Sequence, residues 1–442
     1  MTAAAASPLA ELEAAIKNSQ PDLAVRSAAH ALQSKTTPLE IARAAAKATA
    51  SQYDDALTGA PRGLVVLCAA VNLFPVMQPQ SRALPILQAV AFVAAEKKGS
   101  PAKPALVVSG EITHLGRSFL FAVRDGDVRE AESIFLGMVN ERSEHKMAGD
   151  MLFRAAVEDM GEGGRKLMVA VKSWQLVRAL GFKDARLILR PAIRYLVRGA
   201  RDRKPFDTIL AALGKEWVDL EGLASGGRPL DEAGRAGVHA TASASDPSAS
   251  VLSTLSLLRD GYAAASIVEG FAREAALRVI ASNGYDVDTA RALMFTHAAR
   301  FVLTFSRTSD RLYALFQAAL RIRSPEPVHV ARRIAQAANE GEELNHLVSE
   351  LEARTSVEAT ARVRSYLARG YSTPRLLDVL ANYACRDAAL ANDGINLVFA
   401  DVCASEFLAS KAADVPAALA KMIASSKRDQ SAYESWKPLV GA

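Results

Sequence analysis

The sequence predicts an all-α protein, and three observations carry this prediction. Alanine, which has the highest helix propensity, is abundant, whereas aromatic residues make up only 6% of the chain. Apolar segments of helical length alternate with short stretches rich in Pro, Gly, Asp and Ser. Similar helical hairpins also recur along the chain. This recurrence predicts degenerate repeats arranged as an α-solenoid or as paired helical bundles.

The first predicted unit fills the N-terminal hundred residues. Ser7 is a suitable N-cap and Pro8 suits the first position of a helix, so the first helix is expected to begin there. It gives way at 19–22, where the sequence reads SQPD. The following helices are expected at 23–33, 38–53, 63–75 and 82–98.

The second unit repeats this order and contains the clearest hairpin in the chain. Helices are expected at 112–123, 128–140 and 145–159. The segment 162–198, EGGRKLMVAVKSWQLVRALGFKDARLILRPAIRYLVR, then reads as two helices joined by a short turn. Setting PRGLVVLCAAVNLF beside GRKLMVAVKSWQLV aligns Arg62 with Arg165, about one hundred residues later along the chain.

Two further copies are predicted beyond a change of composition. The stretch 223–250, LASGGRPLDEAGRAGVHATASASDPSAS, has no periodic apolar face and is interpreted as a loop or linker. After it, ARALMFTHAARFVLTF places Arg291 opposite Arg165, and GINLVFADVCASEFL begins the last copy. The predicted domains are therefore 1–222 and 251–442, with two units each and the linker between them.

Composition excludes little but points to a soluble cytoplasmic protein. The formal charge of +5 does not by itself imply a nucleic-acid or membrane partner. Three scattered cysteines provide neither a disulfide framework nor a CxxC metal site, which fits a reducing compartment. The first residues carry Glu11 and Glu13 and no basic region, so no targeting peptide is expected. The most apolar run, 63–74, is too short to span a bilayer.

Four arginines at four-residue spacing form a basic stripe on the second helix of the hairpin. From 165 to 204 there are twelve Lys and Arg against two acids, and the stripe consists of Arg186, Arg190, Arg194 and Arg198. Like charges at this spacing are mildly unfavourable on an isolated helix, so a compensating partner is expected. One hypothesis is an anion-binding surface for nucleic acid, phosphate or an acidic protein. The alternative is simple solvation, or pairing with neighbours such as Glu130, Glu132, Glu158 and Asp159. Pro191 is expected to kink or restart this helix.

The glycine-rich turn before the hairpin offers a second candidate anion site. Residues 161–164 read GEGG, and Arg165 and Lys166 follow at the start of a helix. Free backbone N–H groups beside two cations suit an anion. The segment is not a P-loop, because it lacks the GxxxxGK[ST] pattern and follows no strand. A flexible turn between helices explains the glycines equally well.

The histidines provide no local metal motif, because no two lie three or four residues apart. Alignment of the third and fourth copies places His297 where Asp401 falls, and pseudo-symmetric helices could bring the two together. The same position holds Cys68 and Val171 in the first two copies. An imidazole held by a carboxylate can act as a general base or a metal ligand. The alternative is a buried hydrogen bond that only satisfies both groups. His114, on an apolar helix, is a further candidate, although a core or rim position explains it equally well.

The segments GGRKLMVAVKSW and RALMFTHAARF resemble bacterial helical proteins of the questin oxidase-like group. In that pattern a histidine often opens the apolar helix after a glycine. This chain has Arg62, Arg165 and Arg291 at the corresponding places. The resemblance implies an all-helical oxidoreductase, but the replaced histidines prevent any catalytic residue from being carried over.

Three functions therefore stay open at the level of sequence. The first is a helical-repeat binding protein that presents a basic face or pocket to an anionic ligand or an acidic protein. The second is an oxygenase-like enzyme with a pocket formed by His297, Asp401 and His114. The third is a nucleic-acid binder. No cofactor can be named from the sequence.

Overall fold

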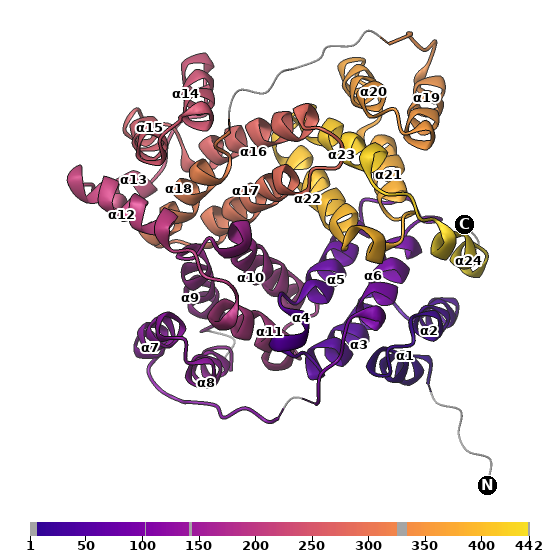
Figure 1. Cartoon of the computed structure of the whole chain (residues 1–442), viewed down its shortest axis with the longest axis horizontal. Coiled ribbons are helices and arrows are strands. Elements are labelled where there is room, and N and C mark those ends of the chain that lie inside the picture. Colours follow the sequence, from indigo (N-terminus) through magenta and orange to yellow (C-terminus); the bar gives the residue numbers. More distant parts are fainter. Residues whose placement is uncertain (1–6, 102, 141–143, 325–333, 441–442) are drawn as a thin grey trace.

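The computed structural model describes residues 7–101, 103–140, 144–324 and 334–440. The described chain is helical throughout, which confirms the predicted all-α class (Figure 1). Its only β pairing within these ranges is an isolated bridge between Arg228 and Tyr262. None of the helices in these ranges is long and apolar enough to cross a membrane.

The first six helices follow the predicted order closely. Their bounds are α1 Pro8–Lys17, α2 Pro21–Gln33, α3 Pro38–Ser51, α4 Asp55–Thr58, α5 Arg62–Leu73 and α6 Ala83–Ala95. The next set runs α7 Ile112–Asp125, α8 Val128–Met138, α9 His145–Val157, α10 Gly161–Ala179, α11 Ala185–Arg198, α12 Lys204–Lys215 and α13 Leu220–Ala224. Helix α11 continues through Pro191 without a break.

The C-terminal half begins with α14 Glu232–Ser243, α15 Pro247–Arg259, α16 Ala264–Ala281, α17 Val287–Phe305, the 3₁₀ turn η2 Ser309–Arg311 and α18 Leu312–Arg321. It ends with α19 Glu340–Ala353, α20 Ser356–Ala368, α21 Thr373–Ala384, the 3₁₀ turn η3 Ala389–Asn392, α22 Ile395–Ser410, α23 Asp414–Ser425 and α24 Ser431–Val440.

Four helices form the centre of the molecule. Helix α5 contacts α10 and α22, and α17 contacts the same two helices, so the four close a ring (Figure 1). Their first turns surround one cavity and their later turns surround another. The four central helices therefore run in the same direction. Each also contacts one outer helix from earlier in the chain and one from later in the chain, and these outer helices are α3 and α6, α9 and α11, α16 and α18, and α21 and α23.

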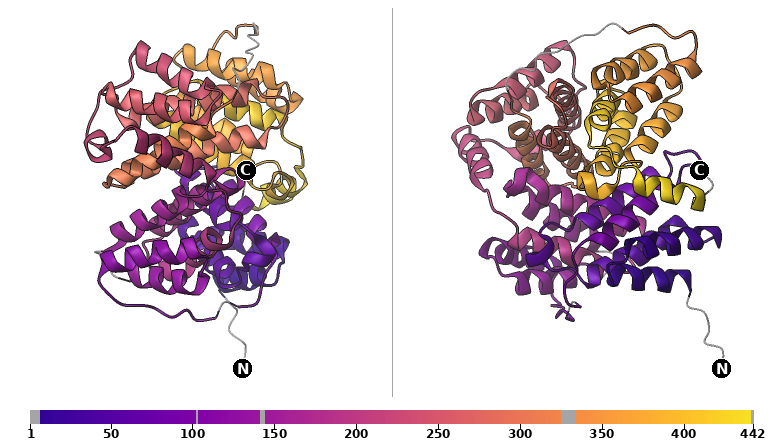
Figure 2. Two further views of the ribbon diagram at one scale, coloured as in Figure 1. Left: turned by 60° about the vertical axis from the view of Figure 1, so that its left-hand side comes forward. Right: turned by 45° about the vertical axis from the view of Figure 1, so that its right-hand side comes forward.

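The ring closes because the C-terminal half returns to the N-terminal helices. Helix α24 contacts α2, and the amide of Gln33 donates a hydrogen bond of 2.9 Å to the carbonyl of Leu439 (Figure 2). The buried amide of Gln88 on α6 donates to the carbonyl of Cys385 at 2.5 Å. In an extended solenoid the first and last helices would lie far apart, whereas here α2 and α24 are in contact. Four helix sets around one centre fit four predicted units, but their common origin and the two-domain division stay predictions.

Glycines allow the central helices to begin close together. Gly164 has a φ of +83°, and a Cβ at this position would overlap the ring of Phe295 on α17. Gly394, with a φ of +73°, lies directly before α22, and a Cβ there would lie 2.5 Å from a methyl of Val66 on α5. The predicted turn at 161–164 is thus a left-handed break, and regular helix follows from Arg165 onward.

The predicted loop at 223–250 is largely helical, and this expectation is corrected. Asp231 caps α14 by accepting a hydrogen bond of 2.8 Å from the backbone N–H of Gly234. A Cβ at Gly234 would lie 2.8 Å from the ring of Tyr262, and one at Gly237 would lie 2.8 Å from Leu257. The small residues therefore serve close helix packing, and sequence composition alone made the segment look like a linker.

Candidate functional site

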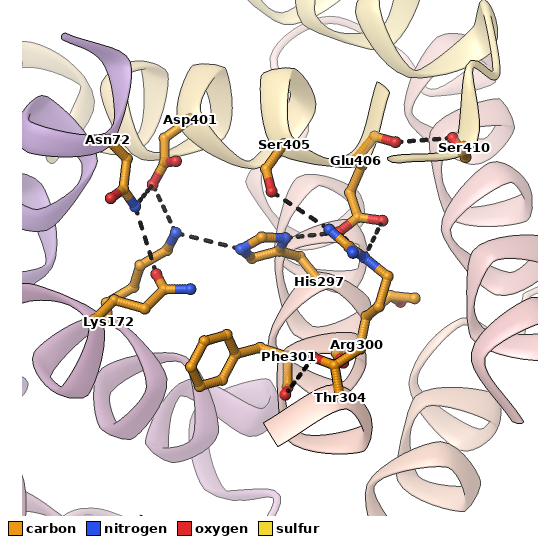
Figure 3. A network of polar contacts seen from close by, with 12 residues as sticks. Asn72, Lys172, His297, Arg300, Phe301, Thr304, Asp401, Ser405, Glu406 and Ser410 are labelled. Atoms are coloured by element: carbon orange, nitrogen blue, oxygen red, sulfur yellow. Dashed lines mark hydrogen bonds and ion pairs between the residues drawn. The ribbon is translucent and has the colours of Figure 1, made fainter. Parts of the chain in front are cut away.

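Three charged or titratable side chains from three central helices meet inside the ring. Lys172 on α10 forms an ion pair of 2.6 Å with Asp401 on α22, and its ammonium lies 3.3 Å from Nε2 of His297 on α17 (Figure 3). Lys172 is fully buried, and Asp401 and His297 are each 3% exposed. A buried charge is costly unless it is paired, so this arrangement depends on all three helices.

His297 is held from its other side by a carboxylate. Its Nδ1 lies 2.6 Å from Oε1 of Glu406, and the same carboxylate accepts two hydrogen bonds from Nε of Arg300 (Figure 3). Burial lowers the pKa of His297, the nearby Lys172 ammonium lowers it further, and Glu406 offsets only part of this effect. The imidazole is therefore neutral near neutral pH. Nδ1–H donates to Glu406, and Nε2 accepts from Lys172.

Glu406 stays ionised although no part of its side chain is exposed. Burial alone would raise its pKa, but the hydrogen bond from His297 and the charge of Arg300 bring that pKa below its usual range. Two cations, Lys172 and Arg300, then balance two carboxylates, Asp401 and Glu406. The network carries no net charge, which explains how it can lie between apolar helix faces.

Helix α5 contributes an amide and a thiol that lie beside Asp401 and Gln175. The amide of Asn72 donates to Oδ2 of Asp401 at 3.3 Å and to Oε1 of Gln175 at 3.5 Å. The Cys68 thiol donates to the same Gln175 oxygen at 3.7 Å. Burial raises the pKa of Cys68 to about 12, so it stays a thiol at neutral pH and is a poor nucleophile.

A cavity of about 540 Å³ opens beside this network at the later turns of the central helices. Apolar side chains cover much of its wall, among them Leu73, Val76, Phe301 and Leu408. Polar groups line the rest, namely Asn72, Gln175, Arg178, His297, Asp401 and Ser405. This combination of an apolar wall with a few convergent polar groups is typical of a site for a small organic molecule.

Four polar groups on the cavity wall, those of Asp401, Gln175, Ser405 and Arg178, have hydrogen-bonding capacity left within the described structure. Oδ1 of Asp401 accepts no hydrogen bond from a described residue, because Lys172 and Asn72 both contact Oδ2. The Nε2 group of Gln175 has no described acceptor. The Ser405 hydroxyl accepts from Arg300 at 3.3 Å and still has its own proton to donate. The cavity thus presents one free carboxylate oxygen, these two donors and the guanidinium of Arg178, which makes no hydrogen bond or ion pair with a described residue.

The sequence placed His297 and Asp401 in one pocket, and the structure places both on the wall of this cavity. They do not contact each other directly. Lys172 lies between them, and the carboxylate that contacts the imidazole is Glu406. Sequence alignment pointed to Val171 at the equivalent position of α10, one residue short of Lys172. Lys172, Glu406 and Gln175 were missed as site residues, and the only signal for Lys172 was its place directly after the apolar run 167–171.

His114 does not belong to this site. It is exposed in the first turn of α7, where its backbone N–H donates to Glu111 at 2.8 Å. Glu111 is the N-cap of that helix and accepts from Thr113 as well. The inclusion of His114 in the pocket is therefore corrected. The sequence placed His114 on an apolar helix but could not show which face of that helix meets the ring.

Each arginine of the basic stripe has a partner. Arg190 forms an ion pair of 2.5 Å with Glu132, and Arg194 pairs with Asp55 at 2.7 Å and with Glu132 at 3.4 Å. Arg198 lies 3.7 Å from Asp55, and Arg186 donates to the side chain of Asn140. The stripe packs against α4 and α8. Two carboxylates, Glu132 and Asp55, therefore balance two of the four arginine charges, and Glu132 is one of the partners that the alternative interpretation of the sequence expected.

The two cations of the candidate anion site at 161–166 point to different places in the structure. Lys166 is 1% exposed and forms an ion pair of 2.6 Å with Asp159, so its charge points into the fold. Arg165 pairs with Glu162 at 2.8 Å and lines the cavity at the first turns of the central helices. Only Arg165 of these two cations is available to a ligand.

Within the described ranges, no group of three or more His, Cys, Asp or Glu is arranged to hold a metal ion. Comparison with known protein families, with curated proteins and with solved structures gave no match to this chain. The resemblance to the questin oxidase-like group therefore stays a prediction from the sequence. The functional proposal rests on the site itself.

Proposed function

We propose that this protein is an enzyme that transfers a proton on a small, mainly apolar organic molecule bearing a carbonyl group. One observation carries the proposal. Asp401 lines a largely apolar cavity with one oxygen held by Lys172 and Asn72, while its other oxygen is free to face a substrate. A carboxylate fixed in this way is suited to general-base catalysis.

The remaining residues have separate roles in this proposal. The Gln175 amide and the Ser405 hydroxyl hold the substrate carbonyl oxygen by donating hydrogen bonds to it. Asp401 Oδ1 takes a proton from the neighbouring carbon, and the electron pair of the broken C–H bond delocalises onto that oxygen as an enolate. The proton on Asp401 exchanges with solvent, and reprotonation of the enolate carbon from Asp401 returns a ketone that carries a hydrogen from solvent. The donors stabilise the developing charge, since they are fixed before the reaction begins.

His297 acts as a positioning residue. Its Nε2 accepts from Lys172 at 3.3 Å, and its Nδ1 is fixed by Glu406, which Arg300 holds in turn. This chain keeps the ammonium directed at Asp401. The His297→Gln variant should lower the rate less than the Asp401→Asn variant does.

Hydrogen–deuterium exchange tests the proposal without a cofactor. 1-Tetralone, a bicyclic ketone, carries an exchangeable CH₂ group beside its carbonyl, and proton NMR in D₂O follows the loss of that signal. We expect exchange to be faster with the protein than in buffer. Asp401→Asn should remove about 10²-fold or more of this acceleration, which is typical of a lost general base. Asp207→Asn, at a side chain that is 59% exposed, is the matched control and should not change the rate.

A second variant separates catalysis from folding. Gln175→Leu removes the proposed donor but leaves the Lys172–Asp401 ion pair untouched. It should slow exchange while the circular dichroism spectrum and the unfolding midpoint stay near those of the unmodified protein. If Gln175→Leu and Asp401→Asn both exchange 1-tetralone at the unmodified rate, the proposed roles are wrong.

The resemblance to oxygenase-like proteins supports a second candidate function at the same cavity. An oxidation would require an oxidant and an electron carrier. One ultraviolet–visible spectrum of the purified protein, with elemental analysis of the same sample, tests for a bound cofactor. The cytoplasm stays our proposed location, supported by three free and buried cysteines. Binding of an acidic protein or of nucleic acid to the basic stripe has less support, because its arginines are paired.

A further inference from the structure

A second cavity lies at the opposite end of the central helices, and nothing in the proposed reaction uses it. It is surrounded by the first turns of α5, α10, α17 and α22. Its volume is about 70 Å³, which corresponds to about five to seven water-sized positions. Arg165 and Lys172 are seven residues apart on α10, so the two sites are separated by roughly 10 Å along the helix axis.

Three arginines from three helices line this cavity. They are Arg62, Arg165 and Arg291, the residues that occupy equivalent places in the sequence alignment. Arg62 forms an ion pair with Asp393, and Arg165 pairs with Glu162. Arg291 makes no hydrogen bond or ion pair with any residue in the described part of the chain, although it is partly buried. Three cations and two carboxylates leave one positive charge without a partner.

The position of these arginines is unfavourable in the absence of an anion. Cations in the first turns of a helix oppose the helix dipole, and Arg62 is the first residue of α5. Burial lowers the pKa of Arg291, and the neighbouring charge of Arg165 lowers it further. An anion beside Arg291 would relieve both effects, because it would supply the missing partner and reduce the repulsion between the two guanidinium groups.

The rest of the wall is apolar. It is formed by Val65 and Val66 of α5, Met168 and Val169 of α10, Phe295 of α17 and Val398 of α22. A fully hydrated anion such as phosphate would gain little from such a wall. A molecule with one anionic head and a short hydrocarbon tail matches both parts of the cavity.

We propose that this cavity binds a short aliphatic carboxylate, with the carboxylate paired to Arg291 and the hydrocarbon tail between the first turns of the central helices. The planar guanidinium can bind both carboxylate oxygens at once. Five to seven waters occupy roughly 150–210 Å³ in the liquid, which is room enough for a carboxylate with a chain of about six carbons. This site is independent of the proton-transfer proposal, because it lies at the other end of the ring and shares no lining residue with the first cavity.

Titration calorimetry with hexanoate tests the proposal. Acetate supplies the same head without the tail, and 1-hexanol supplies the same tail without the charge. We expect saturable binding of hexanoate and binding about tenfold or more weaker for each of the other two. If acetate or inorganic phosphate binds as tightly as hexanoate, the apolar wall plays no part and the proposal fails. Absence of hexanoate binding also overturns it.

Variants then place the ligand. Arg291→Met keeps the length of the side chain and removes no described ion pair, so the fold should be retained, as circular dichroism can verify. It should weaken hexanoate binding about tenfold or more, and Arg291→Lys should have a smaller effect. Arg186→Met on α11 is the matched control and should bind like the unmodified protein. Unchanged affinity in Arg291→Met would show that the carboxylate lies elsewhere and would overturn the proposal.

Discussion

Replacement of Lys172 by Met should destabilise the fold strongly. The Lys172 side chain has no exposed surface, the Asp401 side chain is 4% exposed, and their charged atoms lie 2.6 Å apart. After the substitution, Asp401 Oδ2 keeps only the Asn72 amide at 3.3 Å. Loss of one partner leaves a buried charge uncompensated, which typically costs about 3–5 kcal/mol of the free energy of unfolding.

Urea unfolding followed by far-ultraviolet circular dichroism measures this loss. Lys17→Met is the matched control. Lys17 is 43% exposed and its ion pair with Glu13 is long, at 3.9 Å, so its replacement should change the free energy of unfolding by no more than about 0.5 kcal/mol. The double variant Lys172→Met with Asp401→Leu removes both charges and should recover at least half of the loss. A loss of less than about 1 kcal/mol for Lys172→Met, or a double variant less stable than the single one, would show that the Lys172–Asp401 ion pair does not stabilise the fold in this way.

Three further predictions follow from burial, backbone geometry and pairing. Folding lowers the pKa of His297 from 6.5, so the unfolded chain takes up a proton first as the pH falls, and stability should decline below pH 6.5. His297→Gln should flatten this decline down to about pH 4.5, where protonation of Glu406 begins to contribute, as urea titrations at several pH values can check. Gly164→Ala should lower the free energy of unfolding by more than about 2 kcal/mol, because the added Cβ would overlap the ring of Phe295. Gly181→Ala is the control: its φ of +73° is similar but the space around it is open, so it should lower that free energy by only about 1 kcal/mol. Equal losses would contradict the packing described for α10 and α17. Arg190→Met should lower the free energy of unfolding by about 2–4 kcal/mol, because it removes a partner of the buried carboxylate of Glu132. Arg186→Met on the same face should change it little. If both variants lose little stability, the arginines of the stripe are only solvated.

Much of the helical architecture could be predicted from local sequence. Ser7 and Asp127 cap α1 and α8 with their side chains, and Thr37 with Glu40 forms a capping box at the start of α3. These capping residues lie within four positions of the groups they bond, so the helix starts can be recognised from the sequence alone. The same reading was wrong at 232–243, where small residues that pack tightly against neighbouring helices were taken for a flexible linker.

The candidate site was predicted only in part, because its contacts join residues that are far apart in sequence. Lys172 and Asp401 are 229 positions apart, and Lys172 and His297 are 125 positions apart. The internal alignment suggested that His297 and Asp401 face the same centre. It could not show that Lys172 lies between them, because a one-residue offset moves a side chain about 100° around a helix.

The sequence predicted that the arginines of the stripe have partners, but it did not identify all of those partners. A stripe of like charges implied partners, and Glu132 was among the expected ones. Asp55 was not expected, because it lies 139 positions from Arg194 on a helix of a single turn. The same limit applies to Arg62, Arg165 and Arg291, which the alignment made equivalent but which only the closed ring brings to one cavity.

Exchange of the 1-tetralone CH₂ protons in D₂O, compared between the unmodified protein and Asp401→Asn, tests whether Asp401 is a general base. We expect the protein to accelerate exchange and the variant to lose about 10²-fold or more of the acceleration while it remains helical. Exchange no faster than in buffer, or equally fast with Asp401→Asn, would contradict the assignment of Asp401 as a general base.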